Sequence, residues 1–380
     1  MTKRLSELDL LRGLSVIGMI LVITPGAWGV GYDWLNHADW EGLVAVDMIA
    51  PAFMFCVGFS IPLSINNSIQ RSTPSAVIAQ QIIRRGILLI LLGIFIHWTG
   101  NTDFSTLRIP GILQRIGLTF IIVSLLILFI GRKQNNLFAP DIKHLAIITA
   151  TVIVGTWLLF FLIPTPGFGA NQFSSNGSWS SFIDQGLFGS AHMWEWGKTK
   201  GIVTYDPDGL TCSITTCASV LIGSILGVMY QQNTAHYTKL KLFGLGLTLI
   251  FLGLAFGIVC PIIKKLWTGS FVLVSSGVSI LSLVALWLIK DYRIIKPLLH
   301  PLHAYGANAL FGFTVSWLGL FWFLDKPIMG DQTIRGLGYS AIKTLIPSEA
   351  LASLFFGASF IIVLYAVLAY MSHKRWYLRL

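Results

Sequence analysis

Long apolar runs recur along the whole chain, and each is long enough to cross a lipid bilayer as a helix. Of the 380 residues, 54% are hydrophobic and only 11% are charged, whereas a soluble domain carries about 25% charged residues. A helix crosses the hydrocarbon core with about 20 residues and satisfies its own backbone hydrogen bonds there. The pattern therefore predicts an all-α polytopic membrane bundle of about ten transmembrane helices. The expected spans are 10–27, 42–65, 86–100, 110–131, 144–164, 209–230, 240–260, 268–289, 302–324 and 350–371.

The lysines and arginines are distributed unevenly between the two sets of connecting segments. The set that includes both chain ends, together with the helix-end residues Arg12 and Lys241, holds 17 of the 26 basic residues. Cytoplasmic segments of membrane proteins carry such an excess, so we expect both termini in the cytoplasm. The formal net charge of +10 is then explained by topology and anionic lipid, and it gives no indication of nucleic acid.

The chain reads as one transmembrane domain over residues 1–380, with one large outer loop at 165–208 and no separate soluble domain. The first apolar run is longer than the core of a signal peptide, and no cleavage site follows it, so we expect no cleaved leader. The cysteines lie in or at the end of apolar runs, and they indicate neither a disulfide framework nor a metal site. They are Cys56, Cys212, Cys217 and Cys260.

The segments expected outside are acidic and rich in tryptophan. Aromatic faces stack on sugar rings and carboxylates bind hydroxyls and amines, so this face suits a neutral or cationic sugar-like ligand. The alternative is that the tryptophans form only the interfacial belt of any membrane protein. The acidic residues are Asp33, Asp39, Glu41, Asp103, Asp184, Glu195, Asp206 and Asp208.

Four of the polar residues inside the expected spans stand out, because ionisable groups there cost free energy unless they pair or line a wet cavity. Asp47 and Arg115 each lie about five residues below the outer end of a span, at about 7 Å depth, and we expect them to pair. Arg12 and Asn308 lie nearer the inner face. Together they suggest a polar path through the bundle. The alternatives are a stabilising ion pair, snorkelling of Arg12 to the inner headgroups, and an interhelical hydrogen bond of Asn308.

His37 lies beside carboxylates in the dense turn between the first two spans, just above Asp47. A histidine with a near-neutral pKa can serve as a general base or a nucleophile. A histidine in a loop is more often a solvated polar residue, and His97 at the outer end of the third span is a rival candidate.

Several short blocks then follow one another in a characteristic order, and together they resemble the transmembrane acyltransferases related to lysosomal heparan-α-glucosaminide N-acetyltransferase. The resemblance covers most of the chain and implies the compact bacterial form of that fold. Many relatives carry asparagine where this chain has Thr24. The blocks are Arg4–Leu5 with DLLRG at Asp9–Gly13, HADWEG at His37–Gly42 followed by Asp47 and Pro51, RIPGILQRIG at Arg108–Gly117, YDPDGL at Tyr205–Leu210, LWTG at Leu266–Gly269, and YGANAL around Asn308.

The resemblance implies transfer of acetyl from cytosolic acetyl-CoA to the amino group of a glucosamine-type sugar at the outer face, without a metal. It implies His37 as the active-site residue and Asp47 as its partner. Direct transfer and a covalent acetyl-histidine both stay open. We expect acetyl-CoA to contact Arg12, Gln114, Arg115 and Asn308. We expect the sugar to contact Trp28, Asp39, Trp40 and Asp208.

The resemblance also implies a multi-pass protein of the bacterial cytoplasmic membrane and leaves room for a homodimer. Two other functions fit parts of the pattern. A transporter for a sugar or small solute would share the polar path, but it would favour inverted repeats and helices broken near the midplane, which the sequence does not indicate. An O-acetyltransferase acting on a glycan would keep the donor and change the acceptor.

Overall fold

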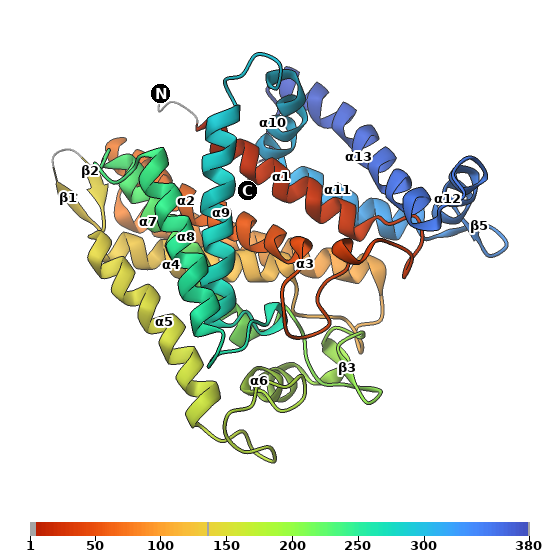
Figure 1. Cartoon of the computed structure of the whole chain (residues 1–380), viewed down its shortest axis with the longest axis horizontal. Coiled ribbons are helices and arrows are strands. Elements are labelled where there is room, and N and C mark those ends of the chain that lie inside the picture. The colour runs from red at the N-terminus through yellow and green to blue at the C-terminus, as the bar shows by residue number, and fades with distance from the viewer. Residues whose placement is uncertain (1–4, 135–136, 379–380) are drawn as a thin grey trace. The chain divides into compact units, whose positions relative to one another are not determined.

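The structure is a computed structural model that describes residues 5–134 and 137–378. Helices dominate it, and the strands are three short antiparallel hairpins (Figure 1). The chain separates into two compact units, with breaks inside helix α2 (Ile49–Gln70) and helix α9 (Gly269–Ile289). Each unit is described by itself.

The first unit contains residues 5–38, 44–53 and 282–378 of the described chain. Helix α1 packs against α10, α11 and α13. A Cβ added at Gly13 would lie 1.9 Å from the carbonyl oxygen of Leu302, so the backbones of α1 and α10 touch where this side chain is missing. The elements are α1 (Ser6–Ile23), η1 (Asp33–Leu35), η2 (Ala45–Met48), η5 (Lys296–Leu299), α10 (His300–Ala307), α11 (Ala309–Gly319), the π-helix η6 (Leu320–Leu324), β5 (Pro327–Met329), β6 (Gln332–Thr333), α12 (Ile334–Leu345) and α13 (Glu349–His373), with the start of α2 and the end of α9.

The second unit contains residues 39–43 and 54–281 of the described chain, and α7 is its central helix. In α7, 83% of the most apolar 18-residue stretch is buried inside the protein, against 17% of the corresponding stretch in α8. Gly58 of α2 and Gly223 of α7 let these two helices meet backbone to backbone, as small residues do in membrane bundles. Its elements are α3 (Ser75–Gly100), α4 (Ile112–Ile130), β1 (Arg132–Gln134), β2 (Leu137–Ala139), α5 (Ile142–Leu162), α6 (Trp179–Phe188), η3 (Ser190–His192), β3 (Lys198–Thr199), β4 (Ile202–Val203), α7 (Leu210–Gln231), α8 (Lys239–Phe256) and η4 (Lys264–Leu266), with most of α2 and α9.

The all-α membrane bundle is confirmed. Within the described residues, eight helices are long and apolar enough to cross a membrane, and the pair α10–α11, bent by 81°, makes a ninth if it is one span. All ten expected segments contain helix. The tenth expected span, α1, is not among these nine, and it carries three charged residues, Glu7, Asp9 and Arg12, within its 18 residues.

Three of the helical segments differ clearly from the sequence prediction. Helix α3 begins at Ser75 rather than at residue 86, so it continues through the basic pair Arg84–Arg85. The second span begins with a 3-10 turn, η2, before α2 runs on to Gln70. The expected ninth span, 302–324, is broken at Asn308. Its overall apolar composition gives no sign of this break.

Candidate active site

The loop after α1 brings His37 and Asp47 together, as predicted. Nδ1 of His37 lies 2.8 Å from Oδ1 of Asp47. The Asp47 side chain is fully buried, whereas 41% of the His37 side chain is exposed. An accessible imidazole is therefore held by a carboxylate that has been withdrawn from water.

The local sequence folds the loop around this carboxylate. Asp47 stands at the third position of η2, and its Oδ2 accepts a hydrogen bond from the backbone N–H of Val44 at 3.2 Å. The backbone N–H of Ala38 lies 3.5 Å from the same oxygen. Backbone donors and the imidazole thus share one carboxylate, which fixes the start and the end of residues 37–47 against each other.

This arrangement defines what His37 can do chemically. A neutral imidazole that donates its Nδ1 proton to Asp47 carries its basic lone pair on Nε2. A carboxylate partner also stabilises the imidazolium formed when Nε2 takes a proton. The pair therefore has the geometry of a general base, His37, whose ring is oriented by the carboxylate of Asp47.

Arg115 and Gln114, at the start of α4, belong to the second unit. Arg115 is 4% exposed, lies 3.4 Å from Oδ1 of Asp208, and stacks its guanidinium 4.7 Å from the centre of the Trp267 ring. It also donates to the carbonyl oxygen of Pro207. Nε of Arg115 and Oε1 of Gln114 have no hydrogen-bond partner among the described residues. The pairing of Asp47 with Arg115 stays a prediction.

Arg108 binds the acidic YDPDGL block. Its Nε and Nη2 donate to the two carboxylate oxygens of Asp206 at 2.9 and 2.6 Å, and Nη2 also reaches Asp208 at 3.0 Å. Burial opposes the charged form, but the guanidinium groups of Arg115 and Arg108 lower the pKa of Asp208. Two of the carboxylates expected to make the outer face acidic are therefore neutralised by arginines, and a sugar-binding role of Asp208 stays a prediction.

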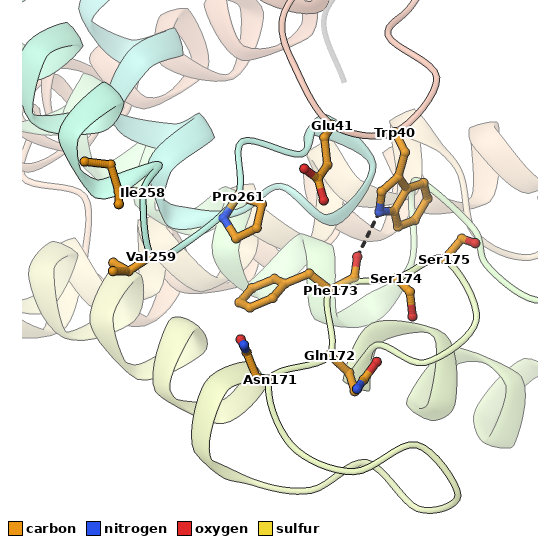
Figure 2. Close-up of a pocket in the computed structure, with 10 residues that line it drawn as sticks. All are labelled: Trp40, Glu41, Asn171, Gln172, Phe173, Ser174, Ser175, Ile258, Val259 and Pro261. Atoms are coloured by element: carbon orange, nitrogen blue, oxygen red, sulfur yellow. Dashed lines mark hydrogen bonds between the residues drawn. The ribbon is translucent and has the colours of Figure 1, made fainter.

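A pocket of about 530 Å³ opens beside Trp40 in the second unit (Figure 2). Trp40 donates its indole N–H to the carbonyl oxygen of Phe173 at 2.8 Å and packs edge-on against Tyr205. Figure 2 shows Glu41 and Trp40 on one side of the pocket and Asn171 and Gln172 on the opposite side. Its volume is in the range of small-molecule sites, and its wall mixes aromatic, amide, hydroxyl and carboxylate groups. The remaining lining residues are Ser174, Ser175, Ile258, Val259 and Pro261.

Trp28, expected to contact the sugar, is 61% exposed and lies in the first unit. The buried guanidinium of Arg335 lies 5.1 Å from the centre of its ring. Arg335 also donates to Asp325 at 2.6 Å and to the carbonyl oxygen of Pro25. These contacts hold the Pro25–Trp28 segment in place. The side chain of Asp39 remains a predicted sugar contact.

The side chain of Arg12, in α1, reaches the end of α10 that precedes Asn308. Nη1 of Arg12 donates to Asp9 at 3.0 Å and to the carbonyl oxygen of Gly306 at 3.4 Å, two residues before Asn308. Asn308 is 1% exposed and stands at the break between α10 and α11. The structure therefore brings two of the predicted donor-binding residues to one place, although their roles stay predictions.

Together, the bundle and the histidine–aspartate pair define a multi-pass membrane protein with a candidate acid–base site in the loop after its first helix. The family profile described as "Heparan-alpha-glucosaminide N-acetyltransferase, catalytic" matches residues 4–223. That match covers more than half of the chain, which belongs to this family.

Two curated relatives carry the same name. The chain is 29% identical to human heparan-alpha-glucosaminide N-acetyltransferase over 332 residues, which cover 76% of this chain and 49% of the human protein. It is 27% identical to the mouse protein over 332 residues, which cover 76% of this chain and 50% of the relative. The chain thus spans about half the length of the curated relatives it matches. The family resemblance predicted from the sequence blocks is confirmed.

Sequence reasoning missed two features of the site region. Residues 171–175, with the sequence NQFSS, line the pocket beside Trp40. The sequence analysis treats them only as part of the outer loop 165–208, although their amide and hydroxyl groups are suited to binding a polar ligand. Arg108 was noted only as part of a block, and its partner Asp206 lies 98 positions further along the chain. For Arg108, the available signal was the opposite charge of Asp206, which lies just before the expected span 209–230.

Proposed function

We propose that this protein transfers an acetyl group from acetyl-CoA to the amino group of a glucosamine-type sugar. The observation that carries the proposal is the contact between His37 and Asp47, which lies inside the region matched by the family profile. A catalytic histidine needs an oriented imidazole with access to substrate, and both conditions are met by a ring held at Nδ1 and partly exposed.

His37 would act at the acceptor amine, which must be neutral to attack. Its Nε2 takes the amine proton as the nitrogen bonds to the thioester carbonyl carbon and the carbon–sulfur bond breaks. The proton then passes to the departing thiolate, and Asp47 stabilises the imidazolium in between. The alternative route has Nε2 attack the thioester first and carry the acetyl group. Trapping labelled acetyl on denatured enzyme, and its absence in His37→Gln, would distinguish the two routes.

Buried polar atoms within each unit, taken separately, support the proposed contacts of the donor. Asn308 and Nε of Arg115 offer hydrogen bonds that no described residue takes up, and Arg12 supplies a cation for a phosphate. A donor aimed at the thioester oxygen would stabilise the negative charge that develops there. Arg12, Gln114, Arg115 and Asn308 are therefore the proposed contacts of acetyl-CoA.

The acceptor sugar is proposed to bind at the pocket beside Trp40. Trp40 is three residues after His37, so the chain itself keeps the two Cα atoms within about 11 Å. The indole offers an aromatic edge, and the Glu41 carboxylate suits an ammonium or a hydroxyl. Trp28 and Asp39, in the same loop, and Asp208 are the further proposed contacts.

The decisive experiment replaces His37 by alanine and by glutamine. We expect the purified variants to keep the melting temperature of the wild type and to lose transfer of acetyl from acetyl-CoA to glucosamine. Asp33→Asn, an exposed carboxylate in the same loop, is the matched control and should remain active. Full activity of both His37 variants would exclude the assignment.

A transporter is the second candidate, because one observation favours it. The 81° bend between α10 and α11 is the kind of broken helix that builds the central sites of transporters. Micromolar CoA should stabilise an acetyltransferase against heat, whereas a sugar transporter should respond to the sugar alone. Offering glucosamine beside glucose separates N-acetyl transfer from O-acetyl transfer.

We also propose the bacterial cytoplasmic membrane as the location, with both chain ends in the cytoplasm and His37 outside. All four cysteines are buried, so a cysteine introduced at an exposed loop position gives a clear labelling signal. Asn36→Cys should react with an impermeant maleimide in intact cells, and Asn233→Cys only after lysis. The reverse result would overturn both the topology and the mechanism. A homodimer stays a prediction.

A further inference from the structure

The helix pair α10–α11 is interrupted inside a segment that is apolar enough to cross a membrane. The two parts meet at Asn308 with a bend of 81°. Backbone hydrogen bonds run from Asn308 N–H to Ala304 and from Gly312 N–H to Asn308. No side chain caps the first turn of α11, and the leading N–H groups of a helix have no partner within the helix itself. Irregular backbone at membrane depth is tolerated where it is buried in protein or lines a cavity.

The side chain of Asn308 is buried at this break, and its polar atoms are unpaired among the described residues. It is 1% exposed, and neither its Nδ2 nor its Oδ1 has a hydrogen-bond partner among the described residues. A buried polar group left without a partner destabilises the folded state. The side chain lacks both an acceptor for its N–H and a donor for its carbonyl oxygen. A second amide would supply both at once, in the planar arrangement of a pair of amides.

Helix α1 makes this break rigid. A Cβ at Gly306 would lie 2.0 Å from the carbonyl oxygen of Asp9, and one at Gly13 would lie 1.9 Å from that of Leu302. The helices therefore touch at backbone distance just before the break. Arg12 extends along the same contact and donates to the carbonyl oxygen of Gly306. Arg12 thus donates to the residue two positions before Asn308, whose buried amide lacks both a donor and an acceptor.

We propose that the α10–α11 break binds the amide-bearing arm of an acyl thioester, with Asn308 pairing with one of its amide groups. Nδ2 of Asn308 donates to the carbonyl oxygen of that amide and Oδ1 accepts its N–H. The first turn of α11 presents its N–H groups to the same end of the arm. The inference rests on the proposed function and specifies the part of the donor that this site recognises.

The test measures heat stability with CoA itself, which carries the amides but no acetyl group. Wild type and His37→Ala should both gain melting temperature with CoA, whereas Asn308→Ala should require at least about tenfold more CoA for the same gain. Without CoA, the melting temperature of Asn308→Ala should be unchanged or higher, because two unsatisfied buried atoms have been removed.

Other outcomes separate the two proposals. If CoA does not stabilise the wild type, the proposed donor is wrong. If CoA stabilises Asn308→Ala as strongly as the wild type, only the present inference is overturned. A lower melting temperature without CoA, with the response to CoA retained, would assign Asn308 to the fold and also overturn it. If Asn308→Ala does not fold, Asn308→Asp keeps the shape and removes the donor, and it should lose the response to CoA.

Discussion

The Asp47 carboxylate is fully buried, and it holds Nδ1 of the partly exposed His37 ring at 2.8 Å. The two residues are ten positions apart and meet across a loop rather than along a helix. Since the same carboxylate also binds the N–H of Val44, it orients the ring and closes the loop at once. Orientation of the imidazole and order of the loop are therefore coupled.

Asp47→Asn should separate these two tasks. The amide retains an oxygen for the N–H of Val44, but it no longer stabilises an imidazolium. We expect kcat for acetyl transfer to fall about 10²–10⁴-fold, with the KM for acetyl-CoA and the melting temperature nearly unchanged. Steady-state kinetics of the purified protein give the answer, with Asp33→Asn as the control. A variant with wild-type kcat would show that the carboxylate has no catalytic part.

The pocket beside Trp40 predicts a different kinetic signature. Glu41→Gln removes a negative charge from the pocket wall, and we expect a several-fold higher KM for glucosamine with kcat little changed, because the change affects binding of the sugar in ground and transition states alike. The control is Glu195→Gln, an exposed carboxylate that does not line the pocket. Equal KM values for wild type and Glu41→Gln would place the sugar elsewhere.

Asp184 predicts a pH dependence of stability. It is fully buried in α6 and accepts the backbone N–H of Leu210 at the start of α7. Burial raises its pKa from 3.8 to about 7. Because the folded state holds this proton more tightly than the unfolded state, the contribution of Asp184 to the unfolding free energy is highest below pH 4 and falls as the pH rises to 7.

Between pH 5 and pH 8 this loss should be on the order of 2 kcal/mol. Asp184→Asn keeps an oxygen for Leu210 and does not titrate, so its melting temperature in detergent should change less over this range than that of the wild type. Asp103→Asn, which alters an exposed carboxylate, should leave the wild-type slope in place. Parallel slopes for wild type and Asp184→Asn would contradict the assignment.

The contact between α1 and α10 predicts a strong steric effect. Gly13→Ala places a Cβ 1.9 Å from a backbone oxygen, and neither helix can yield without losing packing. We expect this variant to be destabilised by several kcal/mol, in the upper range for point mutations, and to lose the response to CoA. Gly155→Ala, in α5 with no atom within 4 Å of the new Cβ, should be neutral or slightly stabilising. Size-exclusion profiles after heating would compare them.

The sequence by itself determined the class of fold, the approximate spans and the pair His37–Asp47. Hydropathy is a local property, because each helix in a bilayer must satisfy its own backbone, and two residues in one short loop are constrained by the chain that joins them. The short blocks likewise sufficed to predict the family, because their order along the chain is itself the signal.

Only the tertiary structure decided the partners that lie far apart in the chain. Arg108 neutralises Asp206, Trp40 binds the carbonyl of Phe173, and Arg12 reaches Gly306 across 294 positions. The break at Asn308 was also hidden, because the residues around it are apolar on both sides and only the packing of α1 against α10 shows where the helix ends. Side-chain chemistry selects which residues can form a site, but helix packing determines which of them meet.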